Sequence, residues 1–172
     1  MAEAGDAEMV VVGTRSPNKM SAAFLGSVAT AVAAKAPCPV VVVRDDRRAG
    51  PIVVGTDGSP DSDDAMSFAF EEASRTGQPL RVVYCWQPQT EYAASAGTTS
   101  ELLKDWLAES VEPSTDKYPT VKVRAAVLEG RAGAQLIKTS ADASLVVVGS
   151  RGRGGVKGLL LGSVRCSWAA HT

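Results

Sequence analysis

The sequence predicts an α/β protein built on an open, twisted, parallel sheet with helices on both faces. Short uninterrupted apolar runs are typical of strands covered on both faces, and they occur at residues 10–12, 40–43, 52–54 and 145–148. Segments of helical spacing alternate with these runs, which favours right-handed βαβ connections and parallel strands. The run at 145–148 ends in a glycine-rich loop, a typical phosphate-binding element of such sheets.

Length and composition agree with this fold class. With 172 residues, 45% of them hydrophobic, the chain is long enough for one domain, or one and a part, with a sizeable core. A net charge of −1 gives no electrostatic case for nucleic acid. No apolar run approaches the roughly 20 residues of a membrane span, and residues 1–8 are too acidic for a secretory signal. We therefore expect a cytoplasmic protein that binds neither nucleic acid nor membrane, with its three cysteines, Cys38, Cys85 and Cys166, reduced and structural.

An internal repeat links the two ends of the chain. Residues 9–34, the first copy, match residues 145–170, the second copy, at an offset of 136 residues. Both contain VVVG, an arginine two residues later, Leu-Gly-Ser-Val and a final Ala-Ala pair. Ser16 stands in the first copy where Gly152 stands in the second, so we assign no nucleotide to the first copy.

The N-terminal elements are a strand, a helix and a second strand. After the strand at 10–12, residues 26–36 suit a helix with Ser27 as its cap, which the Pro37-Cys38-Pro39 sequence ends. The strand Val40–Val43 follows. Residues 45–50 are charged and turn-like, which predicts an exposed linker.

The next strand and helix meet at a turn rich in capping residues. Pro51–Asp57 holds a continuous apolar strand, and Ser59 is a natural N-cap with Pro60 at the first helical position. A calcium loop at Asp57–Asp61 lacks the required glycine and terminal glutamate, so the acidic residues are assigned to the helix dipole. The helix runs to Thr76 with Gly77 as C-cap, and its buried positions are Ala65, Met66, Ala69, Phe70 and Ala73.

Four further elements lead to the glycine loop. Leu80–Trp86 predicts a strand, and the polar segment Gln87–Thr99 a lid or a loose connection. Ser100–Val111 predicts a helix stopped by Pro113, and Val121–Val127 alternates as an edge strand does. A short helix after Gly130 then precedes the strand at 145–148.

The glycine loop excludes two common nucleotide motifs and fits a third. A Walker A loop fails because Gly158 follows Lys157 where Ser or Thr is required. A dinucleotide fingerprint fails because Lys157 occupies the place of the third glycine. The spacing that fits is Gly149-x2-Gly152-x9-Gly162-Ser163, and through it the chain resembles the universal stress protein family in its ATP-binding branch.

The resemblance implies a strand order of 3-2-1-4 and a divided chain. Residues 1–44 are similar to the end of one universal stress domain, 45–50 to a linker, and 51–172 to a second domain without its last strand, as in a tandem member of the family. Ligands of open α/β sheets bind where the strand order reverses, at the carboxyl ends of the strands. With this order, that point lies between the strands ending at Asp57 and Val148.

Chemistry and resemblance together assign site roles. Backbone N–H groups of Gly152–Gly155 and Gly162–Val164 suit phosphates, with the Ser163 hydroxyl and the Arg153 charge beside them. By resemblance, Asp57 contacts ribose or a metal-phosphate group whose metal would be Mg²⁺, and the backbone near Gly55, Cys85 and Val148 encloses adenine. Asp57 is alternatively a turn residue, whereas Arg151, Lys157 and His171 are expected to be solvated or inert. The predicted cofactor-binding residues are Gly55, Asp57, Cys85, Val148, Gly149, Gly152, Arg153, Gly162, Ser163 and Val164.

Three functions remain open: an ATP-binding stress-response regulatory module, a weak ATPase or phosphoryl-transfer enzyme, and a fragment with impaired nucleotide binding. Phosphoryl transfer requires a positioned base and a firm metal clamp, and beyond Asp57 none is recognisable. Binding without fast turnover is therefore favoured, and no catalytic residue is assigned.

The sheet edge suggests how the chain associates. The strand at 145–148 is an apolar edge if the last strand is missing, and exposed edges invite pairing. We expect Val40–Val43 to cover it, antiparallel in the same chain with 10–12 parallel farther out, or parallel from a second chain in a homo-oligomer. Removal of residues 1–44 is then expected to expose the edge and cause self-association.

Overall fold

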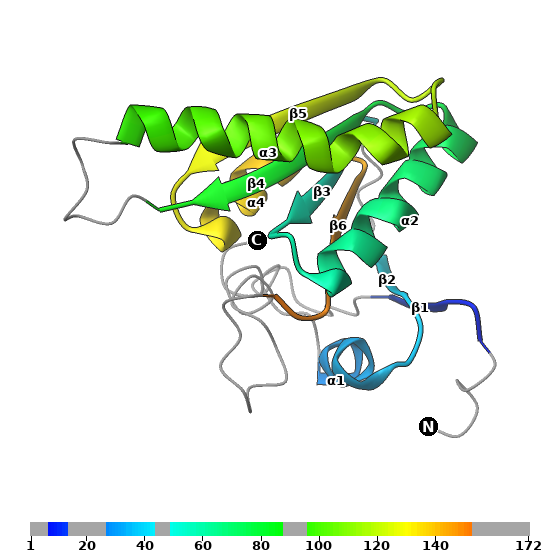
Figure 1. Ribbon diagram of the computed structural model, residues 1–172. Coiled ribbons are helices and arrows are strands. Elements are labelled where there is room, and N and C mark those ends of the chain that lie inside the picture. Colours follow the sequence, from blue (N-terminus) through cyan, green and yellow to red (C-terminus); the bar gives the residue numbers. More distant parts are fainter. Residues whose placement is uncertain (1–6, 14–26, 44–48, 88–95, 153–172) are drawn as a thin grey trace.

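The computed structural model describes residues 7–13, 27–43, 49–87 and 96–152. Within these ranges the strands form two sheets (Figure 1), a four-stranded sheet in the order β5-β4-β3-β6 and a two-stranded sheet β1-β2, and every pair is parallel. The strands are β1 Val10–Gly13, β2 Val40–Val43, β3 Ile52–Thr56, β4 Leu80–Trp86, β5 Val123–Glu129 and β6 Leu145–Val148. The helices are α1 Ser27–Lys35, α2 Pro60–Thr76, α3 Ala96–Lys117 and α4 Ala132–Thr139, and a 3-10 turn, η3, spans Ser140–Asp142.

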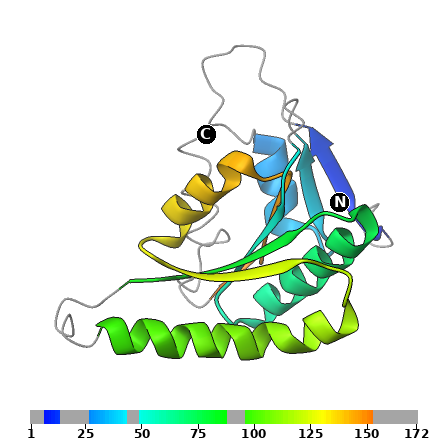
Figure 2. The ribbon, with the colours of Figure 1, turned by 90° about the horizontal axis from the view of Figure 1, so that it is seen from above.

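Helices cover both faces of the four-stranded sheet, which confirms the predicted fold class. Figure 2 shows α2 (teal) and α3 (green) on one side of the strands and α4 (yellow to orange) on the other. The side chains of Ile52 and Val54 pack toward α2 and α3, in a cluster that includes Phe70 and Leu107. The side chains of Val53 and Val83 pack with Leu136 of α4. Consecutive residues of β3 are therefore buried on opposite faces, as the uninterrupted apolar run predicts.

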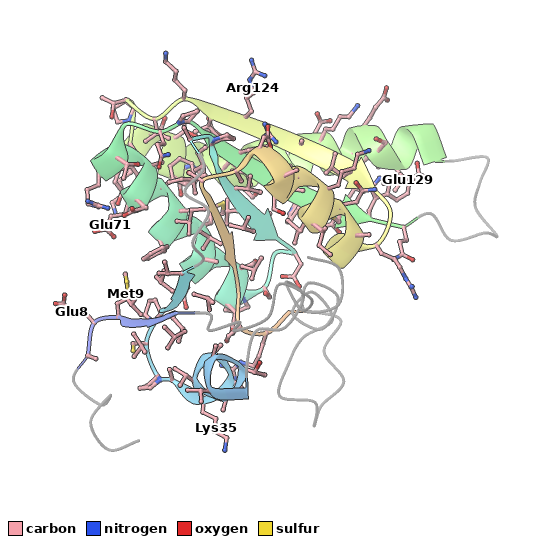
Figure 3. The ribbon with its side chains drawn as sticks, turned by 180° about the vertical axis from the view of Figure 1, so that it is seen from behind. Glu8, Met9, Lys35, Glu71, Arg124 and Glu129 are labelled. Atoms are coloured by element: carbon pink, nitrogen blue, oxygen red, sulfur yellow. The ribbon has the colours of Figure 1, made fainter. Side chains whose placement is uncertain are left out.

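The strand order agrees with the expected 3-2-1-4. The central strand β3 pairs with β4 on one side and β6 on the other, and β5 pairs with β4. Arg124, Ala125 and Glu129 of β5 are exposed, and Figure 3 shows the Arg124 side chain pointing away from the strand. This exposure fits the predicted edge position of β5.

Helix α2 follows the sequence prediction closely. It begins at Pro60 after the N-cap Ser59, and it ends at Gly77, whose φ of 68° is left-handed. Its buried residues include the five predicted ones, with Phe70 fully inaccessible to solvent. Ser62, which the sequence analysis did not single out, is buried with them.

Helix α3 differs from its prediction at both ends. It begins at Ala96 instead of Ser100, and it continues through Pro113 to Lys117. An interior proline removes one helical hydrogen bond and usually costs about 3 kcal/mol. Beyond Pro113, the Tyr118 ring stacks on Phe70 with centroids 6.0 Å apart, and Val121 is buried. Packing on both sides of the proline explains why the helix does not stop there.

The pairing expected for Val40–Val43 within one chain is wrong. β2 pairs with β1 in parallel, in the register Val10↔Val40, and no described strand pairs with β6 except β3. The parallel arrangement of β1 and β2 was expected, but the antiparallel contact of β2 with β6 is not formed. β1 and β2 are joined locally through α1, which packs on β2, whereas the expected contact spans more than a hundred residues of chain. Closing the short loop costs less conformational entropy.

Candidate functional site

The predicted ligand crevice lies at the carboxyl ends of β3 and β6. Gly55 of β3 is in register with Val148 of β6. From β3 the chain passes through α2 to β4 on one side, while β6 lies on the other, so the strand order reverses between β3 and β6. This is the place where open α/β sheets bind ligands, and it agrees with the position inferred from the sequence.

Asp57 begins the turn after β3 and also lies beside Gly152 of the glycine loop. Its Oδ1 accepts a hydrogen bond from the Ser59 N–H at 3.0 Å, so the turn interpretation of Asp57 is correct. Its Oδ2 lies so close to Gly152 that a Cβ added there would overlap it. The structure therefore brings together two residues that are 95 positions apart in the sequence, and a side chain at position 152 would require the Asp57 carboxylate to shift.

A buried hydroxyl network holds the Asp57 turn. The Ser62 hydroxyl donates to the Ser59 carbonyl at 2.8 Å and lies 3.1 Å from Thr56 Oγ1. Because Ser62 has only one hydroxyl hydrogen, Thr56 is the donor in the second bond. Ser62 Oγ also accepts from the Asp57 N–H at 3.4 Å. Sequence periodicity identified neither Thr56 nor Ser62, since both act through side-chain hydrogen bonds and not through apolar spacing.

Ser59 occupies the N-cap position of α2, but its side chain does not cap the helix. No side-chain capping bond is formed, and the backbone carbonyl of Ser59 accepts from the Ser62 and Asp63 N–H groups. The Ser59 hydroxyl oxygen is buried and has no hydrogen-bond partner in the described part of the chain. An unsatisfied buried hydroxyl next to Asp57 calls for an explanation.

The start of the glycine loop is attached to the first turn of α2. A Cβ at Gly149 would lie 2.8 Å from the Asp61 carbonyl oxygen, so this contact requires glycine. The Asp61 carboxylate accepts from the Ser150 hydroxyl at 2.5 Å and from the Arg151 N–H at 3.0 Å, and it pairs with Arg151 Nε at 3.2 Å. The Ser150 hydrogen bond, followed by the bonds and charge of Arg151, holds the pKa of Asp61 below its ordinary value despite some desolvation.

Asp61 is thus a site residue that the sequence analysis assigned only to the helix dipole. Arg151 was expected to be solvated, and 85% of its side chain is exposed even in the ion pair with Asp61. The sequence offered one weak signal, an acidic residue in the turn beside the crevice. Nothing in it paired that residue with a loop 90 positions away.

Gly55, Cys85 and Val148 line the face of the sheet that α4 partly covers. Cys85 and Val148 pack against the cluster of Val53, Val83 and Leu136, and a Cβ at Gly55 would meet the Leu136 side chain at 3.1 Å. Cys85 is a free thiol, as expected, and burial raises its pKa to about 11. At neutral pH it is therefore protonated and a weak nucleophile.

Four predicted site residues, Arg153, Gly162, Ser163 and Val164, lie outside the described residues, as do Lys157, Cys166 and His171. In residues 7–13, 27–43, 49–87 and 96–152, no group of three His, Cys, Asp or Glu side chains is placed to hold a metal ion. Over the same ranges, no helix combines the length and apolar character that crossing a membrane requires.

The fold and the strand switch point define a class of protein: a parallel α/β sheet with the start of a glycine loop beside a carboxylate. The model of the universal stress protein family matches residues 1–44 and 49–171. The chain belongs to this family.

Relatives with known sequences support the same assignment. Universal stress protein Rv2005c of Mycobacterium tuberculosis is 40% identical over 92% of this chain, and Universal stress protein Rv2623 of that organism is 36% identical over the same share. The chain covers 57% of the length of each, so it spans little more than half of these relatives.

Solved structures agree on the fold. A universal stress protein from Archaeoglobus fulgidus aligns over 99% of this chain and 60% of its own, with a TM-score of 0.65 and 21% identity. A universal stress protein in complex with cAMP aligns over 74% of this chain and 94% of its own, with a TM-score of 0.53 and 24% identity.

Proposed function

We propose that this chain is an ATP-binding regulatory module of the stress response, with the nucleotide bound by the Gly149–Val164 loop at the carboxyl ends of β3 and β6. The observation that carries the proposal is the close approach of Gly152 to Asp57 at the strand switch point. A glycine next to a carboxylate lets the backbone and an acceptor side chain approach one ligand together.

The first part of the proposal concerns the nucleotide class. The family includes a protein whose structure was solved with cAMP, so an adenine nucleotide is a ligand that this fold accepts. For this chain, we place adenine against the backbone near Gly55, Cys85 and Val148, and phosphates on the N–H groups of the loop that begins at Gly152. Arg153 and Ser163 supply further donors in this arrangement.

A magnesium ion, where ATP brings one, has two candidate protein contacts. The Asp57 carboxylate is a hard oxygen ligand, and the buried Ser59 hydroxyl lacks a partner among the described residues. Mg²⁺ is usually held by one or two protein groups together with substrate phosphates. These residues fit such a shared site, in which the ion would reduce the repulsion between Asp57 and the phosphates.

Binding without fast turnover is the favoured form of the function, with a weak ATPase or phosphoryl-transfer enzyme as the alternative. A general base must be free to take a proton in the reacting complex. Asp57 Oδ1 already accepts the Ser59 N–H, and Asp61 is made a weaker base by its Ser150 and Arg151 partners. A third possibility, a fragment with impaired binding, follows from the partial coverage of the relatives.

We also propose that the chain corresponds to the end of one universal stress domain followed by most of a second, and that copies associate through a sheet edge. The two separately matched segments, 1–44 and 49–171, support the division. The edge of β6 opposite β3 pairs with no described strand of the same chain, and a strand from a second chain would cover such an edge.

Isothermal titration calorimetry with ATP and Mg²⁺ tests the proposal. Gly152→Ala is expected to weaken ATP binding at least about tenfold, because a methyl group there crowds both Asp57 and the phosphate path. Ser16→Ala, at the equivalent position of the first copy, is the matched control and is expected to change nothing. Equal losses in both variants would show that the second copy is not the site, and a wild-type chain without measurable heat would refute ATP binding.

A further inference from the structure

A single carboxylate oxygen connects α2 to the glycine loop. Asp61 Oδ2 accepts from the Ser150 hydroxyl, the Arg151 backbone N–H and Arg151 Nε, at 2.5, 3.0 and 3.2 Å. Charged acceptors make the stronger class of hydrogen bond. The backbone also touches at this point, since Gly149 lies against the peptide between Asp61 and Ser62.

These contacts determine which part of the loop remains available to a ligand. The Arg151 N–H is donated to Asp61 and therefore cannot also donate to a phosphate. The next residue, Gly152, is the one that passes Asp57. Asp61 thus fixes the backbone immediately before Gly152, the residue that lies beside Asp57.

The charges around Asp61 agree with a positioning role. An isolated carboxylate near a phosphate site repels the ligand, whereas here Arg151 neutralises it across the ion pair. The exposed Asp63 lies in the same turn of α2 and shares the favourable interaction with the helix dipole. Asp63 is therefore a natural comparison that separates a helix effect from an effect on the loop.

We infer that Asp61 is a positioning residue for the nucleotide loop: by holding Ser150 and Arg151, it prearranges the backbone at Gly152 for phosphate. The inference rests on the proposed function and adds to it a residue that touches no ligand. Prearranged donors raise affinity because less conformational entropy is lost on binding. Asp61 accordingly affects affinity through the order of the loop and not through contact.

The experiment compares Asp61→Ala with Asp63→Ala in the full chain. Asp61→Ala is expected to weaken ATP binding about fivefold to tenfold in calorimetry, while Asp63→Ala changes it less than about twofold. The second readout needs no nucleotide: amide hydrogen exchange of Arg151, followed by NMR, is expected to be at least about tenfold faster in Asp61→Ala, because its acceptor is lost. Asp63→Ala leaves that exchange rate unchanged.

A double-mutant cycle with Arg151→Ala tests the route of the effect. If Asp61 acts through Arg151 and Ser150, the losses of affinity in Asp61→Ala and Arg151→Ala are less than additive. Equal ATP affinity in Asp61→Ala and Asp63→Ala, or unchanged Arg151 exchange in Asp61→Ala, overturns the inference while ATP binding by the wild type stands. Fast exchange in Asp61→Ala without ATP binding by the wild type instead refutes the proposed function and, with it, the role assigned to Asp61.

Discussion

The sequence VVVG occurs twice in this protein, and its final glycine has a different environment in each copy. In β1 the final glycine, Gly13, has no atom within 4 Å of the position of an added Cβ. Directly after β6, the equivalent Gly149 lies against the backbone of α2. Val11 of β1 is 61% exposed, whereas all four residues of β6 are at least half-buried between α2 and α4 or beside β3.

This difference shows that the candidate site at the VVVG motif depends on the strands and helices packed beside it. β6 pairs with β3, and the residues that meet its glycine loop, Asp57 and Asp61, come from the turn after β3 and from α2. β1 has β2 as its only strand neighbour in the described part of the chain. A repeated sequence therefore supports a site only where the sheet beside it supplies the second half.

Core truncation is expected to give the largest contrast between the two regions. Phe70 of α2 is fully buried and stacks on Tyr118, so Phe70→Ala leaves a cavity and is expected to lower the free energy of unfolding by about 3–5 kcal/mol. Val11→Ala in β1 is expected to change it by no more than about 0.5 kcal/mol. Urea unfolding followed by circular dichroism measures both, and a larger loss from Val11→Ala would mean that β1 belongs to the main core.

The equivalent glycines Gly13 and Gly149 allow the same comparison with a smaller expected change in stability. Gly149→Ala places a methyl group 2.8 Å from the Asp61 carbonyl oxygen and is expected to cost about 1–3 kcal/mol through overpacking. Gly13→Ala meets open space and is expected to be neutral within about 0.5 kcal/mol. Thermal unfolding of the two variants is the measurement; similar shifts in Tm for both would contradict the environments described above.

Removal of residues 1–44 is expected to have the smallest effect on the four-stranded sheet. The two core clusters contain no residue of β1, α1 or β2, and β2 does not cover β6. We therefore expect residues 45–172 to unfold at nearly the Tm of the whole chain, and multi-angle light scattering to give the same state of association for both. Aggregation of the shortened chain alone would instead support the expectation from the sequence, that residues 1–44 cover the edge of β6.

Local patterns in the sequence identified most elements correctly. The limits of α2, from the cap at Ser59 to the left-handed Gly77, and the span of β4 follow from capping residues and β-branched content, which act within a few residues. The parallel order β5-β4-β3-β6 required the family resemblance as well. Asp57 and Gly152 were both named from the sequence because a carboxylate after a strand and a glycine at fixed spacing are local signals.

Contacts between segments that are distant in the sequence were determined by the tertiary structure alone. The continuation of α3 through Pro113 depends on Tyr118 packing on Phe70, and helix propensities do not include such a tertiary contact. The sequence likewise contains no pattern that pairs β2 with β1 instead of β6. Nor does any pattern link Asp61 with Ser150 and Arg151, to which it is hydrogen-bonded. Sequence by itself determined the local conformations and the chemistry available in this protein. The tertiary structure chose which of those groups meet, because that choice depends on the packing energy of the whole sheet and its helices.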